Sequence, residues 1–295
     1  MKVSLGIAPI NWTNDDMPEL GAENTFEQCI SEMALAGFEG CEVGNKFPRD
    51  TSVLKKALAL RNLRICNQWH SYELTTKSLA ENVAAFRQTL SFLKTMGAPV
   101  IGGGETGNSC QGRVDVPVFS GKGMLATNAE WKSFTSGMNE LGKIAADSGL
   151  KLAFHHHMGT CIQSAEETER FLNDTHPDHV FLNYDCGHFY FAGEDPVACL
   201  GRFAGRTAHV HLKDIRPGVL ESVRRESMSF LDAVRKGVFT VPGDLEGCID
   251  FKGLFSVLRQ SGYSGWLVVE AEQDPALANP LTYAQMAKKF LDGLI

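Results

Sequence analysis

Histidine, aspartate and glutamate gather at the ends of four short apolar runs in the second half of the chain. The runs end in His155-His156-His157, in Asp185-Cys186-Gly187-His188, in His209-Val210-His211-Leu212-Lys213 and in Glu270-Ala271-Glu272. Imidazole nitrogens and carboxylate oxygens are ligands of borderline divalent metals such as Mn²⁺, Co²⁺ and Zn²⁺. If the four runs are neighbouring strands, their ends predict one metal site.

Side-chain alternation along a strand selects the candidate ligands within these runs. It places His155 and His157 on one face of their strand, and His209 and His211 on one face of theirs. A single histidine at a strand end is usually a polar residue with its hydrogen bonds satisfied and no metal bound. Three histidines in a row could also form a solvated turn. The prediction therefore depends on four strands converging. The predicted metal ligands are His155, Asp185, His211 and Glu270.

Other polar and aromatic residues end the remaining runs. His70 and Glu105 could face a pocket or lie in solvent-exposed loops. Trp12 and Trp69 could wall a ring-shaped substrate, although core packing explains them equally well. Glu42 is interpreted as a partner of Arg49 or Lys46. The candidate substrate-binding residues are Trp12, Trp69 and Glu105.

The elements that must position these residues alternate regularly. Strands are expected at residues 3–10, 38–43, 63–69, 99–102, 150–157, 180–185, 207–212 and 266–271, and helices at 25–36, 51–60, 76–96, 128–147, 165–173, 196–203, 251–261 and 281–291. Eight β-α units predict an α/β fold, a single (β/α)₈ TIM barrel formed by residues 1–295, with its active site at the carboxyl ends of the strands. The rival open sheet lacks a Gly-x-Gly-x-x-Gly turn after its first strand.

The composition and net charge of the chain disfavour some classes of binding partner. The chain has 295 residues, is 43% hydrophobic and carries a formal net charge of −7, which disfavours nucleic acid and an anionic membrane surface. Its eight cysteines include no Cys-x-x-Cys pair, a pattern typical of free thiols in a reducing cytoplasm. The sequence leaves a homo-oligomer open.

Four segments carry a resemblance to a known family. They are residues 6–18, 32–38, 155–160 and 265–275. The chain resembles the xylose-isomerase-like barrel superfamily over essentially its whole length, and within it the inosose dehydratases. The resemblance implies Mn²⁺ or Co²⁺ as cofactor, an association with glutathione, and dehydration of 2-keto-myo-inositol (inosose) to 3D-(3,5/4)-trihydroxycyclohexane-1,2-dione. One departure is Leu245 to Cys248, where the family usually has a shorter turn.

The expected mechanism begins with loss of a proton next to the ketone, with the metal stabilising the enolate, and ends with loss of the β-hydroxyl. We expect Glu270 to adjoin the base, with His70, Glu105 or Lys213 taking the proton. His157 or His188 would protonate the leaving hydroxyl. The substrate is therefore expected to be a cyclic polyol ketone.

Three alternatives remain at this stage. Related isomerases and epimerases usually have glutamate where His155 stands, so a sugar epimerase or isomerase is the first. An abasic-site endonuclease is the second, and it predicts a basic groove. A metal-free binding barrel is the third, and it predicts no effect of chelation.

Overall fold

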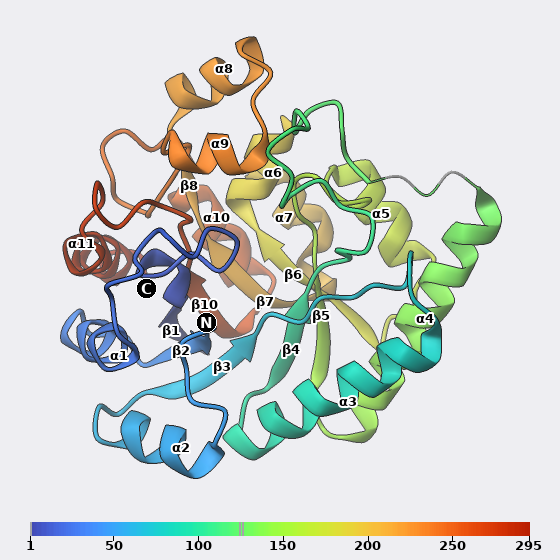
Figure 1. The fold of residues 1–295 in the computed structure, drawn as a ribbon, viewed down its shortest axis with the longest axis horizontal. Helices are drawn as coiled ribbons and strands as arrows, with labels where there is room; N and C mark the ends of the chain where they lie inside the picture. Colours follow the sequence, from blue (N-terminus) through green and yellow to red (C-terminus); the bar gives the residue numbers. More distant parts are fainter. Residues whose placement is uncertain (1, 124, 126) are drawn as a thin grey trace.

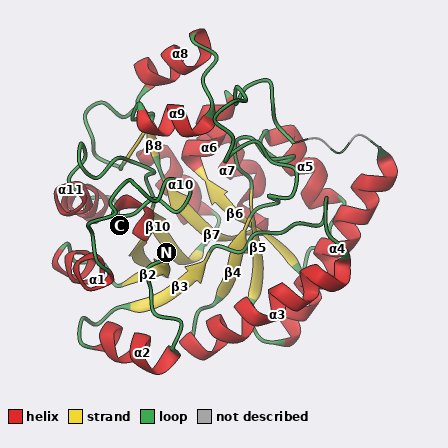
Figure 2. Ribbon diagram, viewed as in Figure 1, coloured by secondary structure: helices red, strands yellow, loops and turns green. Residues whose placement is uncertain are grey.

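The computed structural model describes residues 2–123, 125 and 127–295, and within these residues eight parallel strands form one sheet surrounded by helices (Figures 1 and 2). The strands are β1 (Lys2–Ile7), β2 (Gly40–Val43), β3 (Arg64–Gln68), β4 (Val100–Gly103), β5 (Lys151–His155), β6 (Val180–Asp185), β7 (Thr207–Leu212) and β10 (Ser264–Val269). Their spatial order is β3-β2-β1-β10-β7-β6-β5-β4. Two single bridges, Trp69–Gly102 and Tyr72–Glu105, join the β3 and β4 ends. The predicted TIM barrel is confirmed.

The outer layer consists of helices that bury one apolar face against the strands. They are α1 (Phe26–Leu35), α2 (Thr51–Ala59), α3 (Leu79–Met96), α4 (Asn128–Asp147), α5 (Ala165–Asn173), α7 (Pro196–Phe203), α10 (Phe251–Gln260) and α11 (Pro280–Asp292). Ser78, Thr127 and Ser164 each begin a helix with a reciprocal capping box. Between β5 and α5, the rings of Phe154 and Phe171 lie 4.4 Å apart. Such aromatic contacts fix the strands that carry the site.

The local structure differs from the prediction after β1 and after β6. The first expected strand ends at Ile7, because the proline-led 3₁₀ helix η1 (Pro9–Asn11) follows it. A short helix, α6 (Cys186–Ala192), begins immediately after β6 and was not predicted. Residues after β7 form a lobe that contains β8 (Asp214–Ile215), α8 (Pro217–Arg225), α9 (Phe230–Arg235) and β9 (Phe239–Thr240), drawn in orange at the top of Figure 1.

The strand register brings the predicted ligands to one end of the barrel. Asp185 pairs with His211 across β6 and β7, and Val268 pairs with His211 across β10 and β7. All eight cysteines are free, and seven of them are buried, as predicted. Among the described residues, no helix is long and apolar enough to cross a membrane.

Candidate metal centre and active-site pocket

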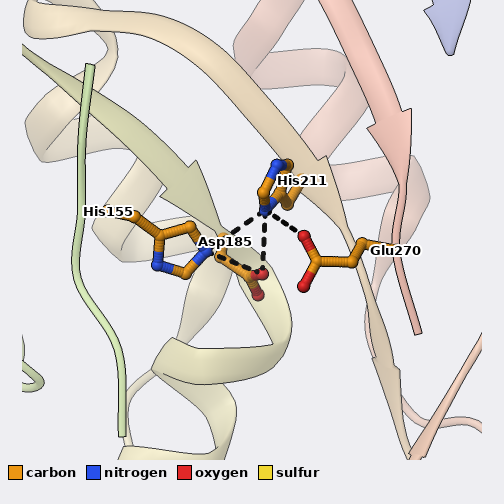
Figure 3. A group of neighbouring side chains, drawn as sticks. All are labelled: His155, Asp185, His211 and Glu270. Atoms are coloured by element: carbon orange, nitrogen blue, oxygen red, sulfur yellow. Dashed lines mark hydrogen bonds and ion pairs between the residues drawn. The ribbon is translucent and has the colours of Figure 1, made fainter. Parts of the chain in front are cut away.

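Four side chains from four adjacent strand ends converge at the carboxyl end of the barrel (Figure 3). His155 Nε2 lies 3.2 Å from His211 Nδ1 and 3.5 Å from Asp185 Oδ2. His211 Nδ1 lies 3.6 Å from Asp185 Oδ2 and 2.6 Å from Glu270 Oε2. One ligand atom from each residue lies within 4.8 Å of all the others. The structure therefore brings together all four predicted metal ligands.

The spacing and environment of these atoms fit a divalent cation. Two ligand atoms about 2.1 Å from a tetrahedral metal are about 3.4 Å apart. Three of the four measured distances, 3.2, 3.5 and 3.6 Å, lie close to that value. Asp185 Oδ2 is also buried without a hydrogen-bond partner among the described residues. Lys213 Nζ lies 3.5 Å from the same oxygen, and a cation bound among the four side chains would add the close contact that this oxygen lacks.

The charges around the cluster favour a cation as well. The carboxylates of Asp185 and Glu270 are buried, and burial by itself raises the pKa of a carboxyl group. Neighbouring cationic groups outweigh this effect: they hold the pKa of Asp185 well below its usual range and lower the pKa of Glu270 to about 2. Burial opposes protonation of His211, yet Glu270 and Glu42 raise its pKa well above the ordinary value. A proton on His211 Nδ1 thus occupies the position at which a metal ion would bind.

A glutamate that the sequence interpretation had assigned elsewhere orients His211. Glu42 Oε1 accepts hydrogen bonds from His211 Nε2 at 2.9 Å and from His209 Nε2 at 2.8 Å. Asn67 Nδ2 donates to the same oxygen at 3.0 Å. The interpretation of Glu42 as a partner of Arg49 or Lys46 is therefore wrong. Because His211 Nε2 donates to Glu42, its Nδ1 is directed toward the cluster, where it could bind a metal ion.

A buried lysine lies behind the cluster and organises a second group of side chains. Lys213 Nζ lies 2.7 Å from Glu270 Oε1, 2.8 Å from Glu272 Oε2 and 3.1 Å from His188 Nε2. Burial alone would lower its pKa, but Asp185 and the two glutamates raise it well above the usual value, so Lys213 is charged. Lys213 in turn keeps Glu272 ionised, because its charge lowers the pKa of that carboxyl despite burial. Glu272 had not been predicted as a site residue.

His157 and His188 differ in access to the open pocket. His188 is completely buried, and its two ring nitrogens contact the Met158 N–H at 3.3 Å and Lys213 Nζ. His157 Nδ1 donates to the Met158 carbonyl at 2.8 Å, which leaves Nε2 directed toward Glu272, 3.9 Å away. Only His157 of these two lines the pocket.

The pocket itself opens beside Glu270 and has a cavity volume of about 110 Å³. Its lining includes Trp69, whose ring lies 5.5 Å from that of His155 and 5.9 Å from that of His157. Its full lining is Ala8, Pro9, Ile10, Asp15, Asp16, Glu42, Val43, Trp69, Gln111, His157, Glu270 and Glu272.

Three predicted site residues lie away from this pocket. His70 Nδ1 contacts Thr89 Oγ1 of α3 at 3.1 Å, and burial lowers the pKa of His70 to about 4. Trp12 is fully buried, and its Nε1 donates to Glu32 at 2.6 Å. The departure at residues 245–248 also lies outside the lining.

Glu105 is the third of these residues, and its carboxylate joins its own loop to the loop that follows β3. It accepts hydrogen bonds from the Leu74 N–H at 2.9 Å, the Thr75 hydroxyl at 2.7 Å and the Gly107 N–H at 2.9 Å. Burial nevertheless raises the pKa of Glu105 to about 7. The structure does not bring it together with the metal ligands.

The fold and the site together define a TIM barrel with a candidate metal centre at the carboxyl ends of its strands. The family model described as xylose isomerase-like TIM barrel matches residues 30–293. The chain is 56% identical over 290 residues to an inosose dehydratase of Geobacillus thermodenitrificans and 54% identical over 290 residues to one of Clostridium beijerinckii, each covering 98% of this chain and 96% of the relative. The chain therefore belongs to the inosose dehydratase family of xylose isomerase-like barrels.

A solved structure agrees with the assignment of fold. The crystal structure of the IOLI protein with a binding zinc atom superimposes with a TM-score of 0.72 at 17% identity, covering 99% of this chain and 97% of that one. At this identity the likeness concerns the fold alone.

Proposed function

We propose that this protein is a metal-dependent hydro-lyase that removes water from 2-keto-myo-inositol and yields 3D-(3,5/4)-trihydroxycyclohexane-1,2-dione. The observation that carries the proposal is the buried cluster of His155, Asp185, His211 and Glu270 beside a pocket, in a chain 56% identical to an inosose dehydratase. The ketone makes its α-proton acidic, and a hydroxyl on the next carbon is the leaving group. We place this reaction in the cytoplasm, where free thiols persist.

We propose Mn²⁺ or Co²⁺ as the metal, held by two imidazole nitrogens and two carboxylate oxygens. This donor set lacks a thiolate and suits borderline divalent ions. When bound, the ion would polarise the substrate ketone and stabilise negative charge on its oxygen, an effect worth several kcal/mol. The family resemblance also implies an association with glutathione. The assay is therefore run with and without it.

Glu272 and His157 are the proposed acid–base pair, because both line the pocket. The C–H bond next to the ketone breaks and its proton passes to the Glu272 carboxylate. The C–O bond of the β-hydroxyl then breaks as His157 Nε2 delivers a proton to that oxygen, so that water leaves and an enol remains. The enol tautomerises to the diketone. Since the two side chains lie 3.9 Å apart, proton and hydroxyl leave from the same face of the ring.

Lys213 and His188 have positioning roles in this scheme. Lys213 is fully buried and makes ion pairs with both Glu270 and Glu272, so it keeps the base ionised rather than contacting substrate. His188 packs at 3.9 Å, ring to ring, against His157 and fixes its orientation. Positioned acid–base groups typically contribute about 10²- to 10⁴-fold in rate.

The test is an ultraviolet assay of chelator-treated protein with 2-keto-myo-inositol, before and after addition of Mn²⁺ or Co²⁺, with and without glutathione. We expect metal to restore growth of the absorbance of the conjugated product. The His155→Gln variant should lose activity, whereas His176→Gln, a matched change at an exposed histidine, should keep it. Metal-independent activity, or no absorbance change with any metal, would overturn the proposal. A ketose epimerase would interconvert sugars without forming this chromophore.

A further inference from the structure

The ammonium group of Lys213 is surrounded by acceptor atoms of the kinds that bind metals. Its Nζ lies 2.7 Å from Glu270 Oε1, 2.8 Å from Glu272 Oε2 and 3.1 Å from His188 Nε2. Asp185 Oδ2 lies 3.5 Å from the same nitrogen. The side chain of Lys213 is fully buried. One cation therefore sits within a closed shell of three carboxylates and an imidazole.

The stem of Lys213 is held so that its charge stays in this position. A Cβ atom at Gly187 of α6 would lie 2.7 Å from Lys213 Cγ and 2.9 Å from its Cβ and Cδ, so the stem passes close over a residue without a side chain. The ring of Phe239 covers the ammonium group, with its centroid 4.6 Å from Nζ. The charge is therefore fixed between the strand ends and the lobe that follows β7.

The same shell contains a second group of potential metal ligands. His157, His188 and Glu272 each offer one ligand atom, and these atoms lie within 4.8 Å of one another. A divalent ion holds nitrogen and oxygen ligands at about 2.1 Å, so the atoms that now contact Lys213 Nζ would have to move inward by less than about 1 Å. Rotation of the flexible glutamate side chains accommodates a movement of this size.

Two carboxylates reach both the candidate metal centre and the ammonium group. Glu270 Oε2 lies 2.6 Å from His211 Nδ1, while its Oε1 lies 2.7 Å from Lys213 Nζ. Asp185 Oδ2 lies 3.5 Å from His155 Nε2 and 3.5 Å from Lys213 Nζ. Two-metal sites hold their ions about 3.5 to 4 Å apart, close enough for one carboxylate to contact both. The arrangement matches such a site, with an ammonium group at one of its two positions.

We propose that Lys213 takes the place of a second metal ion and so restricts this centre to one metal. The inference goes beyond the proposed reaction and rests on the metal centre proposed for it. The ammonium group offsets the charge of the surrounding carboxylates, but it has no vacant ligand position for water. A second divalent ion would bind water, lower its pKa and supply a hydroxide nucleophile. Lys213 thereby keeps a metal-bound hydroxide out of a site that performs elimination.

The experiment counts the metal ions bound to each chain. Proteins purified with excess Co²⁺ and freed of unbound ion by gel filtration are analysed by mass spectrometry for cobalt. We expect about one ion per chain in wild type and about two in Lys213→Ala. Adding Glu272→Gln to Lys213→Ala should return the count to one, because Glu272 contacts only the second position. Lys143→Ala, which removes an exposed lysine paired with Asp147, is the control and should bind one ion.

A second readout and a second variant accompany the count. With Mn²⁺ in place of Co²⁺, electron paramagnetic resonance should show a magnetically coupled pair of ions in Lys213→Ala and isolated ions in wild type. Lys213→Gln, which keeps most of the side-chain volume but removes the charge, should also bind two ions. Circular dichroism of each metal-loaded variant verifies folding.

The outcomes separate this inference from the proposed function. If wild type and both Lys213 variants bind one ion, the inference fails alone. If wild type binds two ions, Lys213 does not restrict the centre, and the inference is wrong while a metal centre remains. If wild type binds one ion but does not dehydrate 2-keto-myo-inositol, the proposed function fails and the metal count still decides the inference. If wild type binds no metal, both fail together.

Discussion

Glu42 provides the sharpest test of how the metal centre is assembled, because it touches His211 without being one of the four ligands. Replacing Glu42 by glutamine keeps the size of the side chain and removes its charge. The hydrogen bond from His211 Nε2, 2.9 Å long in the native protein, then loses its charge assistance. His209 Nε2 and Asn67 Nδ2, which share the same oxygen, lose it too. The imidazole of His211 becomes a weaker and less firmly oriented ligand.

The expected size of the effect follows from the behaviour of carboxylates that hydrogen-bond to metal-binding histidines. Loss of such a partner typically lowers metal affinity about 10- to 100-fold, or about 1.4 to 2.7 kcal/mol. We expect Glu42→Gln to weaken Co²⁺ binding by this amount, measured by competition with a chromophoric chelator. The Co²⁺ absorption spectrum should shift as His211 reorients.

The matched control is Glu39→Gln, which alters an exposed glutamate paired with Arg64 near the start of the same strand. We expect its Co²⁺ affinity and spectrum to equal those of wild type. If Glu42→Gln also bound Co²⁺ with wild-type affinity and an unchanged spectrum, the reasoning would be refuted and Glu42 would have no part in orienting His211.

Three further predictions concern stability. Lys213→Met leaves Glu270 and Glu272 buried without their cation, so we expect a loss of about 3 to 5 kcal/mol in the free energy of unfolding of the metal-free protein, measured by urea titration. Glu270 has its pKa lowered from 4.5 to about 2, so its contribution to stability is present above pH 4.5 and lost as the pH falls toward 2; Glu270→Gln should flatten that part of the acid titration. The pKa of Glu105 is raised from 4.5 to about 7, so the native state holds a proton that the unfolded state has lost. The free energy of unfolding therefore falls as the pH rises from 4.5 to about 7. Glu105→Gln should remove this slope, and an unchanged slope would contradict the assignment.

The barrel and the convergence of the four candidate metal ligands could be predicted because both follow from local patterns. His155, Asp185 and His211 are the last or nearly last residues of their strands, and Glu270 immediately follows β10. Parallel strands place those ends together. Glu42 could not be assigned in the same way. It lies 167 and 169 residues from the histidines that contact it, and only closure of the sheet brings β2 opposite β7.

Other errors came from the face on which a residue lies. Strand β3 ends at Gln68, and alternation then turns Trp69 toward the pocket and His70 outward against α3. Trp12 follows a 3₁₀ helix rather than a strand, so its ring enters the core beside Glu32. Asp15 and Asp16 belong to a loop, whose path depends on contacts such as those of Lys46 that no periodic pattern encodes.

Asp185 serves two purposes with its two oxygens. Its Oδ1 accepts the His188 N–H at 2.9 Å and so begins helix α6, while its Oδ2 faces His155 and His211 in the metal centre. One carboxylate group therefore both caps the start of helix α6 and contributes an oxygen to the candidate metal centre. A change to alanine at this position would damage both at once, whereas asparagine would keep an oxygen to cap the helix and remove the anionic ligand. A substitution at this position therefore perturbs the start of helix α6 and the candidate metal centre together.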